Sequence, residues 1–177
     1  MPGRNRMDSF EKVLPKLVKI QLFADFDITK DEDVRILKAV YDNLSIEKFG
    51  AGQTIIKEGE TGDQFYILYS GSVLITRGTP AGDVIALATL SSEQNIFFGE
   101  TAIISNDTRS ATVSAKTECT TLTLSGKKFL QICDKEPILG YRVLAVLARR
   151  LANNIRESNR DKAILYEALC NEIEIGA

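Results

Sequence analysis

The residues with the clearest chemical potential lie in one stretch, FFGETAIISNDTRSATV, which covers residues 97–113. Gly99 lets a ligand approach the backbone closely, because it has no side chain. The residues that follow, ETAIIS, are compatible with one short helical turn, and the N–H groups at a helix start can bind an anionic oxygen. Arg109 adds a planar, permanently charged guanidinium that fits phosphate oxygens. The stretch therefore indicates an anion site.

Glu100 needs a separate explanation, because a carboxylate beside a phosphate would repel it. An ionised carboxylate accepts hydrogen bonds from hydroxyl groups, and the hydroxyl donor beside a phosphate in a nucleotide belongs to a ribose. Glu100 and Arg109 together suggest a nucleotide with one charged phosphate and a free 2′-hydroxyl. The alternative is a simple surface ion pair between these two side chains, which would contribute little to stability.

The composition excludes several classes of enzyme. The sequence of 177 residues contains no histidine, which removes Ser-His-Asp and Cys-His nucleophilic sites and the commonest metal ligand. Cys119, Cys133 and Cys170 are widely spaced and odd in number, so they indicate reduced thiols and not a disulfide framework or a zinc site. We expect a protein that is not an enzyme, with no catalytic residues, no metal and no cofactor.

The charge and hydropathy pattern indicates a cytoplasmic protein. A formal net charge of −2 provides no global field that would attract DNA or anionic lipid, so we expect no direct nucleic-acid binding. The longest apolar run, ILGYRVLAVLA, is about half the length of a membrane span and includes Arg142. The N-terminus has basic residues but no apolar segment typical of a secretory signal. We therefore expect no membrane association.

The elements that must position the stretch fall into three segments. Residues 1–48 are predicted to be helical, because their apolar residues recur at helical intervals, and TKDE has the form of a capping box with Thr29 as N-cap and Glu32 reaching back. Over residues 49–126, short apolar runs alternate with glycines, which is typical of short strands joined by tight turns. About seven or eight strands result, enough for an antiparallel sandwich or barrel.

Helical spacing returns over residues 127–177, after Ser125 as a candidate N-cap and with Pro137 at a helix start. One apolar stripe consists of Leu144, Leu147, Leu151 and Ile155. A second consists of Ile164, Leu165, Ala168, Leu169 and Ile173, after a polar break at RESNRDK. The stripes could pack on the β-rich segment or pair across a two-fold axis, so a homodimer stands as an alternative to a monomer.

The stretch over residues 97–113 resembles the phosphate-binding cassette of cyclic nucleotide-binding domains. That pattern runs Phe-Gly-Glu, a small or apolar pair, a short helix and loop, and then Arg, a small residue, Ala, Thr or Ser, and Val. The upstream run GQTIIKEGETGDQFYILYSGSVLI is similar to the family's other signature, two strands joined by an EG-x-x-G-D turn and closed by a glycine. The resemblance spans about residues 17–151.

This resemblance implies a mainly β fold, an eight-stranded antiparallel β-roll of the jelly-roll type with N-terminal helices and a C-terminal lid helix. It implies cAMP as the ligand, with cGMP as the alternative. Glu100 then accepts from the ribose 2′-hydroxyl and Arg109 pairs with the cyclic phosphate. Gly99, Thr101 and Ala102 match the backbone portion of the cassette, and Ser110 matches a position that touches phosphate or base. Asp63 and the glycines at 52, 59, 62 and 71 match turn scaffolding and not ligand contacts.

The sequence departs from the family pattern at one position of the cassette. The residue before the arginine is usually proline, whereas here it is Thr108, so the loop is less pre-set. The two charged contacts remain available. Ser110 does not decide which purine is bound.

The resemblance implies a stand-alone sensor or an excised regulatory domain, whose lid helix moves over the ligand and signals to an unknown effector protein. About 20 residues follow Asn154, too few for a helix-turn-helix domain. On the lid, Arg149, Arg150, Asn153 and Asn154 could contact a purine edge. The alternative is an interaction scaffold that keeps the fold but no longer binds a cyclic nucleotide.

Overall fold

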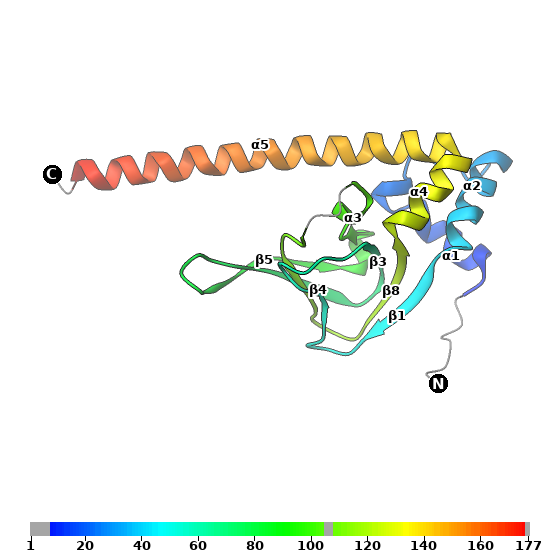
Figure 1. Cartoon of the computed structure of the whole chain (residues 1–177), viewed down its shortest axis with the longest axis horizontal. Helices are drawn as coiled ribbons and strands as arrows, with labels where there is room; N and C mark the ends of the chain where they lie inside the picture. Colours follow the sequence, from blue (N-terminus) through cyan, green and yellow to red (C-terminus); the bar gives the residue numbers. More distant parts are fainter. Residues whose placement is uncertain (1–7, 105–107, 176–177) are drawn as a thin grey trace.

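The computed structural model describes residues 8–104 and 108–175, and within these it contains two four-stranded sheets with helices before and after them (Figure 1). The strands are β1 (Ser45–Phe49), β2 (Thr54–Ile56), β3 (Gln64–Ser70), β4 (Ser72–Gly78), β5 (Val84–Ser91), β6 (Phe97–Phe98), β7 (Thr112–Ala115) and β8 (Cys119–Ser125). The helices are α1 (Phe10–Leu17), η1 (Gln21–Phe23), α2 (Asp31–Tyr41), η2 (Ser92–Gln94), α3 (Thr101–Ile104), α4 (Gly126–Lys135) and α5 (Pro137–Ile175). The expected mainly β fold, an eight-stranded antiparallel β-roll with flanking helices, is confirmed.

The two sheets face each other and enclose the core of the roll. One sheet has the strand order β1-β8-β3-β6 and the other β2-β7-β4-β5, and all pairings are antiparallel. The side chains buried between them are Ile56, Tyr66, Leu68, Val73, Phe98, Val113, Ala115 and Cys119. The glycine-punctuated runs of the sequence therefore form short strands with one apolar face turned into the roll.

A second and larger core lies between the β1-β8-β3-β6 sheet and the helices. It includes Phe65, Phe97, Leu122 and Phe129 together with buried residues of α1, α2 and α5. Because side chains alternate along a strand, Phe97 enters this helical core while its neighbour Phe98 enters the core of the roll. The backbone that leads into Gly99 is thus fixed from both sides.

The structure confirms one predicted helix start and corrects another. The Ser125 hydroxyl accepts from the backbone N–H of Lys128 at 3.2 Å, as predicted for the start of α4. The capping box at Thr29 is wrong, because α2 begins at Asp31 after Lys30, which makes no side-chain cap bond. The Thr29 hydroxyl instead donates to the Asp27 carboxylate at 2.7 Å, a local partner that competes with the cap.

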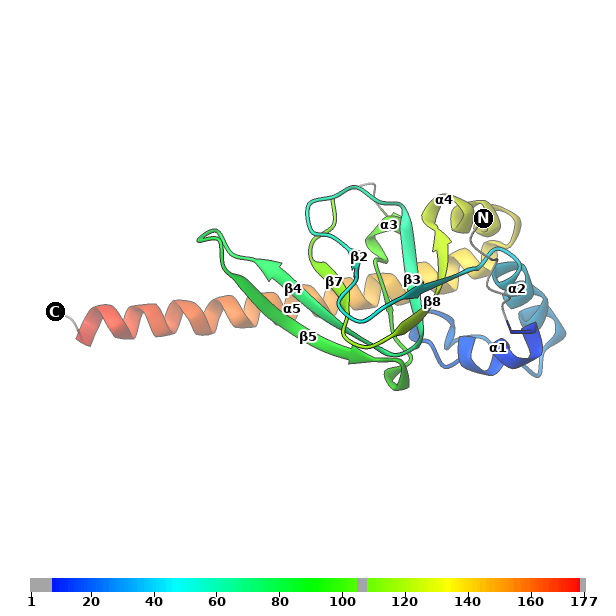
Figure 2. The same cartoon turned by 90° about the horizontal axis from the view of Figure 1, so that it is seen from below.

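The C-terminal helix is longer than predicted. α5 begins at Pro137, as expected, and continues for 39 residues without interruption. The break predicted at RESNRDK is wrong, because this segment contains neither glycine nor proline and its polar side chains are exposed on the helix surface. In Figures 1 and 2, the first part of α5 lies along the roll and its helices, whereas the second part projects beyond them. Among the described residues, no helix combines the length and apolarity that crossing a bilayer would require.

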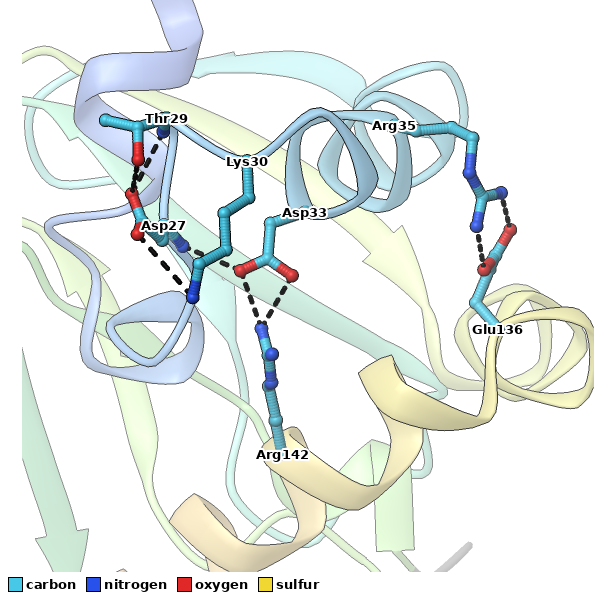
Figure 3. A network of polar contacts seen from close by, with 7 residues as sticks. All are labelled: Asp27, Thr29, Lys30, Asp33, Arg35, Glu136 and Arg142. Carbon is cyan, nitrogen blue, oxygen red and sulfur yellow. Dashed lines mark hydrogen bonds and ion pairs between the residues drawn. The ribbon is translucent and has the colours of Figure 1, made fainter.

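Two ion pairs join the helices before the roll to those after it (Figure 3). Arg142 of α5 donates to both carboxylate oxygens of Asp33 at 2.9 Å, and its guanidinium lies 4.6 Å from the centre of the Phe26 ring. Arg35 of α2 donates to Glu136 at 2.9 Å, just before α5 begins. Burial pushes the pKa of Asp33 upward, but the N–H of Asp27 and the Arg142 guanidinium outweigh it and hold this pKa below its ordinary value of 3.8. The N-terminal part of α5 is therefore tied to α2.

Candidate functional site

Arg109 is a buried cation with neutral partners. Arg109 is only 7% exposed, and it lies five residues after the end of α3. Nη1 donates to the carbonyl oxygen of Gly99 at 3.1 Å, and Nη2 donates to that of Gln64 at 2.5 Å. Within residues 8–104 and 108–175, no carboxylate forms an ion pair with it. A buried charge without a counter-ion is costly, so this position favours an incoming anion.

Two glycines make room for the guanidinium. A Cβ on Gly99 would lie 3.0 Å from Nη1 of Arg109, and a Cβ on Gly62 would lie 3.0 Å from Nη2. Gly99 also has a φ of 75°, which residues with side chains rarely adopt. Gly62 was expected to serve only as turn scaffolding, whereas it lies directly against the phosphate-binding candidate.

The turn around residues 59–61 fixes the backbone of Arg109. The N–H of Gly59 donates to the carbonyl of Arg109 at 2.9 Å, and the N–H of Arg109 donates to the carbonyl of Glu60 at 2.9 Å. Thr108 and Thr61 form an isolated antiparallel bridge. The chain immediately before Arg109 is therefore held by pairing with the EG-x-x-G-D turn, although it lacks the usual proline.

Glu100 faces α5 and not Arg109. Its Oε1 lies 3.6 Å from Nε of Arg150, and the Arg150 guanidinium stacks 4.6 Å from the centre of the Phe97 ring. The side chain of Glu100 is 19% exposed, so part of the carboxylate stays accessible. The alternative of a surface ion pair between Glu100 and Arg109 is thus wrong: the two charges have separate partners.

These groups line a single cavity of about 160 Å³ between the cassette, the roll and α5. Its polar side is formed by Gly99, Glu100, Thr101, Arg109, Ser110 and Arg150, and its apolar side by Ile56, Ile75, Phe98, Ala111 and Val113. Ser110 is exposed, so the cavity opens at the surface near the start of β7. A positive group, a carboxylate and an apolar wall within one cavity can bind a molecule that carries a phosphate, a hydroxyl and a flat ring.

Five of the six predicted site residues line this cavity: Gly99, Glu100, Thr101, Arg109 and Ser110. The sixth, Ala102, belongs to α3, and its side chain lies outside the described part of the structure. Their roles toward a ligand stay predictions.

Sequence reasoning missed Gly62 and the carbonyl of Gln64, and it left Arg150 as one of four candidates on the lid. The position of Arg150 gives the signal that was available: it follows Val146 and Leu147, both buried, by four and three residues, so it shares their helix face. The neighbouring Arg149 is not among the residues that line the cavity, and its Nη2 lies 3.3 Å from Oδ2 of Asp25.

Comparison with known proteins agrees with this geometry. The model of the cyclic nucleotide-binding domain family matches residues 46–136, just over half of the chain. The chain belongs to this family. The matched region runs from β1 to the end of α4 and contains the whole cavity except Arg150.

Two curated relatives show the range of proteins that carry this domain. The cAMP-activated global transcriptional regulator CRP of Pasteurella multocida is 35% identical over 113 residues, which are 63% of this chain and 53% of that protein. Human cGMP-dependent protein kinase 2 is 39% identical over 80 residues, 45% of this chain and 10% of the kinase. The chain therefore spans about half of the bacterial regulator and a small part of the kinase.

Solved structures resemble the chain over a longer region. A cyclic nucleotide-binding domain from Methylobacillus flagellatus KT has a TM-score of 0.69 and 25% identity, and the match covers 84% of this chain and 79% of that one. The regulatory domain of Toxoplasma gondii PKA, crystallised with cAMP, has a TM-score of 0.67 and 26% identity, with 81% and 49% covered.

Proposed function

We propose that the chain is a sensor that binds a cyclic nucleotide in the cavity between the cassette and α5. The proposed ligand is cAMP. The observation that carries this proposal is Arg109: the residue is 7% exposed, and among the described residues its guanidinium has only the carbonyls of Gly99 and Gln64 as hydrogen-bond partners. One singly charged phosphate at the cavity would neutralise it. No catalytic step is proposed.

The contacts available can supply a useful affinity. Micromolar binding needs about 8 kcal/mol, and a charge-assisted hydrogen bond contributes about 1.5–3 kcal/mol. Arg109 to the phosphate and Glu100 to the ribose hydroxyl provide three or four such bonds. Packing of the base against Ile56, Ile75 and Val113 then offsets the cost of association.

The ligand would signal through α5. Glu100 is the proposed ribose acceptor and already contacts Arg150, so a ligand that binds Glu100 also meets α5. The cavity of about 160 Å³ is smaller than the roughly 300–1,000 Å³ of most ligand pockets, so binding requires α5 or the cassette to shift. We propose that this shift is the output that a separate effector protein reads.

The choice of cAMP over cGMP follows from the relatives. The bacterial regulator is named as cAMP-activated, and the Toxoplasma regulatory domain was crystallised with cAMP. The kinase is named for cGMP, so cGMP is the competing ligand to test.

Isothermal titration calorimetry with cAMP and with cGMP tests the proposal. We expect heat of binding with cAMP, and a loss of roughly 10- to 150-fold in affinity for Arg109→Ala, which removes one charge-assisted contact. Arg77→Ala is the matched control, because Arg77 is an exposed arginine of β4 that pairs with Glu58 away from the cavity. The affinity of the Arg77→Ala variant for cAMP should equal that of the unmodified chain.

A folded chain that gives no heat and no thermal shift with either nucleotide would contradict the proposal. That outcome would favour the interaction scaffold, whose support in the sequence is Thr108 in place of proline. If the Arg109→Ala variant binds the nucleotide as tightly as the unmodified chain does, the ligand binds at another site.

A further inference from the structure

Two adjacent cavities lie outside the proposed ligand site and extend from α1 to α5. The first has a volume of about 350 Å³ and is lined by the lysines Lys12, Lys16 and Lys19. The second has a volume of about 430 Å³, and Arg150 of α5 is part of its wall. Lys19 and Asn95 line both cavities, so the two meet at these residues. We call the two cavities together the basic trough, after their three lysines and Arg150.

The three lysines lie on one face of the chain because of their spacing. They are four and three residues apart, on α1 and in the turn that follows it, and residues at these intervals are neighbours on a helix surface. Val13 and Leu17, each one position after a lysine, are buried in the helical core. The packing of α1 on the core therefore holds the lysines side by side at the edge of the domain.

The lysines of the basic trough lack acidic partners. Among the described residues, no carboxylate forms an ion pair with Lys12, Lys16 or Lys19. The half-buried Lys16 donates to the backbone oxygen of Tyr69, and its ammonium lies 4.4 Å from the centre of the Tyr69 ring. Burial lowers the pKa of Lys16, so these neutral partners compensate its charge incompletely. Of the residues that line the two cavities, Glu93 alone is acidic.

The spacing and the polar groups of the basic trough fit an extended peptide. Lys12 and Lys16 are about 6 Å apart along the helix axis, and alternate side chains of an extended strand are about 6.6 Å apart. The amide side chains of Gln21, Gln94 and Asn95 line the second cavity, and amides can pair with the N–H and C=O groups of a peptide backbone. Carboxylates at alternate positions of such a peptide can therefore each meet one lysine.

We propose that the basic trough binds an extended acidic segment of a partner protein. The carboxylates of this segment pair with Lys12, Lys16 and Lys19, and an apolar residue near one of its ends packs on Leu90 and Ile96 in the second cavity. Lysines act as separate point charges, whereas a phosphate group favours the planar fork of arginine. Three lysines in a row therefore favour separate carboxylates over a phosphate.

Arg150 connects the basic trough to the proposed ligand cavity. Its side chain lines both, and its Nε lies 3.6 Å from Oε1 of Glu100 in the ligand cavity. A carboxylate that reaches Arg150 from the trough competes with Glu100, so the partner and the nucleotide change each other's affinity by the same factor. This coupling rests on the proposed function, whereas binding of the acidic segment does not.

NMR titration of the isotope-labelled chain without nucleotide tests the proposal. The probe is a synthetic peptide, Glu-Ala-Glu-Ala-Glu-Leu, capped at both ends, and the same peptide with glutamine in place of glutamate is the control. We expect the acidic peptide to shift the backbone amide signals of Lys12, Lys16, Lys19 and Asn95, with a Kd on the order of 0.1–1 mM, because exposed ion pairs each contribute little. The shifts should diminish as the salt concentration is raised.

Substitutions separate the basic trough from a general effect of charge. Lys12→Gln with Lys19→Gln removes two cations of the trough and should weaken peptide binding about 5- to 20-fold. Lys116→Gln with Lys127→Gln removes two exposed lysines that line neither cavity, so this matched control should bind like the unmodified chain. Glu93→Gln removes the acidic lining residue and should tighten binding about two- to three-fold.

Several outcomes would overturn the proposal. It is rejected if the acidic peptide shifts none of these signals, or if the glutamine peptide shifts them equally. An equal loss of affinity in the Lys116→Gln, Lys127→Gln control would show that the peptide responds only to net charge. If inorganic phosphate or phosphatidylserine vesicles perturb the same signals more strongly than the peptide does, the trough binds phosphate groups and not an acidic segment. Because no nucleotide is present, each result is independent of the proposed function.

Discussion

At the scale of single residues, the charged side chains of the site differ in how far a partner of opposite charge compensates them. Arg109 is deeply buried, and in the part of the chain that the structure describes its guanidinium donates only to carbonyl oxygens, so dipoles and no described counter-ion stabilise its charge. Glu100 and Arg150 are partly exposed and pair with each other. An anion therefore gains most by approaching Arg109, while the Glu100–Arg150 pair can rearrange at small cost.

The contact between Glu100 and Arg150 should contribute modestly to ligand affinity. We expect Arg150→Ala to weaken cAMP binding about two- to five-fold, because a partly exposed ion pair contributes about 0.5–1 kcal/mol and its loss leaves Glu100 less well oriented. Titration calorimetry measures the change. The neighbouring Arg149→Ala is the control, since Arg149 pairs with Asp25 outside the cavity, and an equal effect of both variants would refute a specific role of Arg150.

At the scale of elements, tight turns decide how closely the strands can approach one another. Gly71 joins β3 to β4, and Gly82 lies in the turn before β5. Both have a φ of 94°, but their surroundings differ. A Cβ on Gly71 would lie 2.3 Å from the backbone oxygen of Glu118, whereas nothing lies within 4 Å of a Cβ on Gly82. Comparing alanine at the two positions therefore separates the cost of the left-handed backbone from the cost of steric overlap.

Alanine at these two turns should therefore differ in effect. Gly82→Ala should cost about 1–2 kcal/mol of the free energy of unfolding, because only the left-handed backbone conformation is penalised. Gly71→Ala should cost about 1–3 kcal/mol more, because the strands must separate to admit the methyl group. Urea denaturation of both variants compares them directly. Equal losses of unfolding free energy in the two variants would show that the turn before β4 can move enough to admit the methyl group.

At the scale of the whole molecule, α5 connects three parts. Its first turns are tied to α2 through Arg142 and Asp33, its middle reaches the cavity through Arg150, and the side chains of its second part are exposed. A shift of α5 on ligand binding would thus be felt at both ends. The carboxylate of Asp33 is one titratable group in this connection, and Glu136 is another.

The Asp33–Arg142 pair should stabilise the fold at neutral pH and less in acid. The pKa of Asp33 lies below its ordinary value of 3.8 in the folded chain, so the stabilisation is complete above that value and is lost as pH falls through the lower, folded-state pKa. Asp33→Asn should cost about 1.5–3 kcal/mol at pH 7. Urea denaturation at pH 7 and at about pH 3 should show the difference from the unmodified chain narrowing. Asp31→Asn, at an exposed position of the same helix turn, serves as the control, and a gap that stays constant with pH would contradict this assignment.

Local patterns in the sequence determined the fold class, the cassette and the start of α4 and α5. Alternating apolar residues, glycines at turns and the Ser125 cap act over a few residues, so their effect can be inferred without the rest of the chain. The tertiary structure alone decided the partners of the charges. It turned Glu100 toward Arg150 and placed Gly62 against Arg109, because these contacts depend on which distant side chains packing brings within a few ångströms. The unbroken course of α5 has a local cause that the sequence already contained, since RESNRDK has no glycine or proline and exposed polar residues do not end a helix.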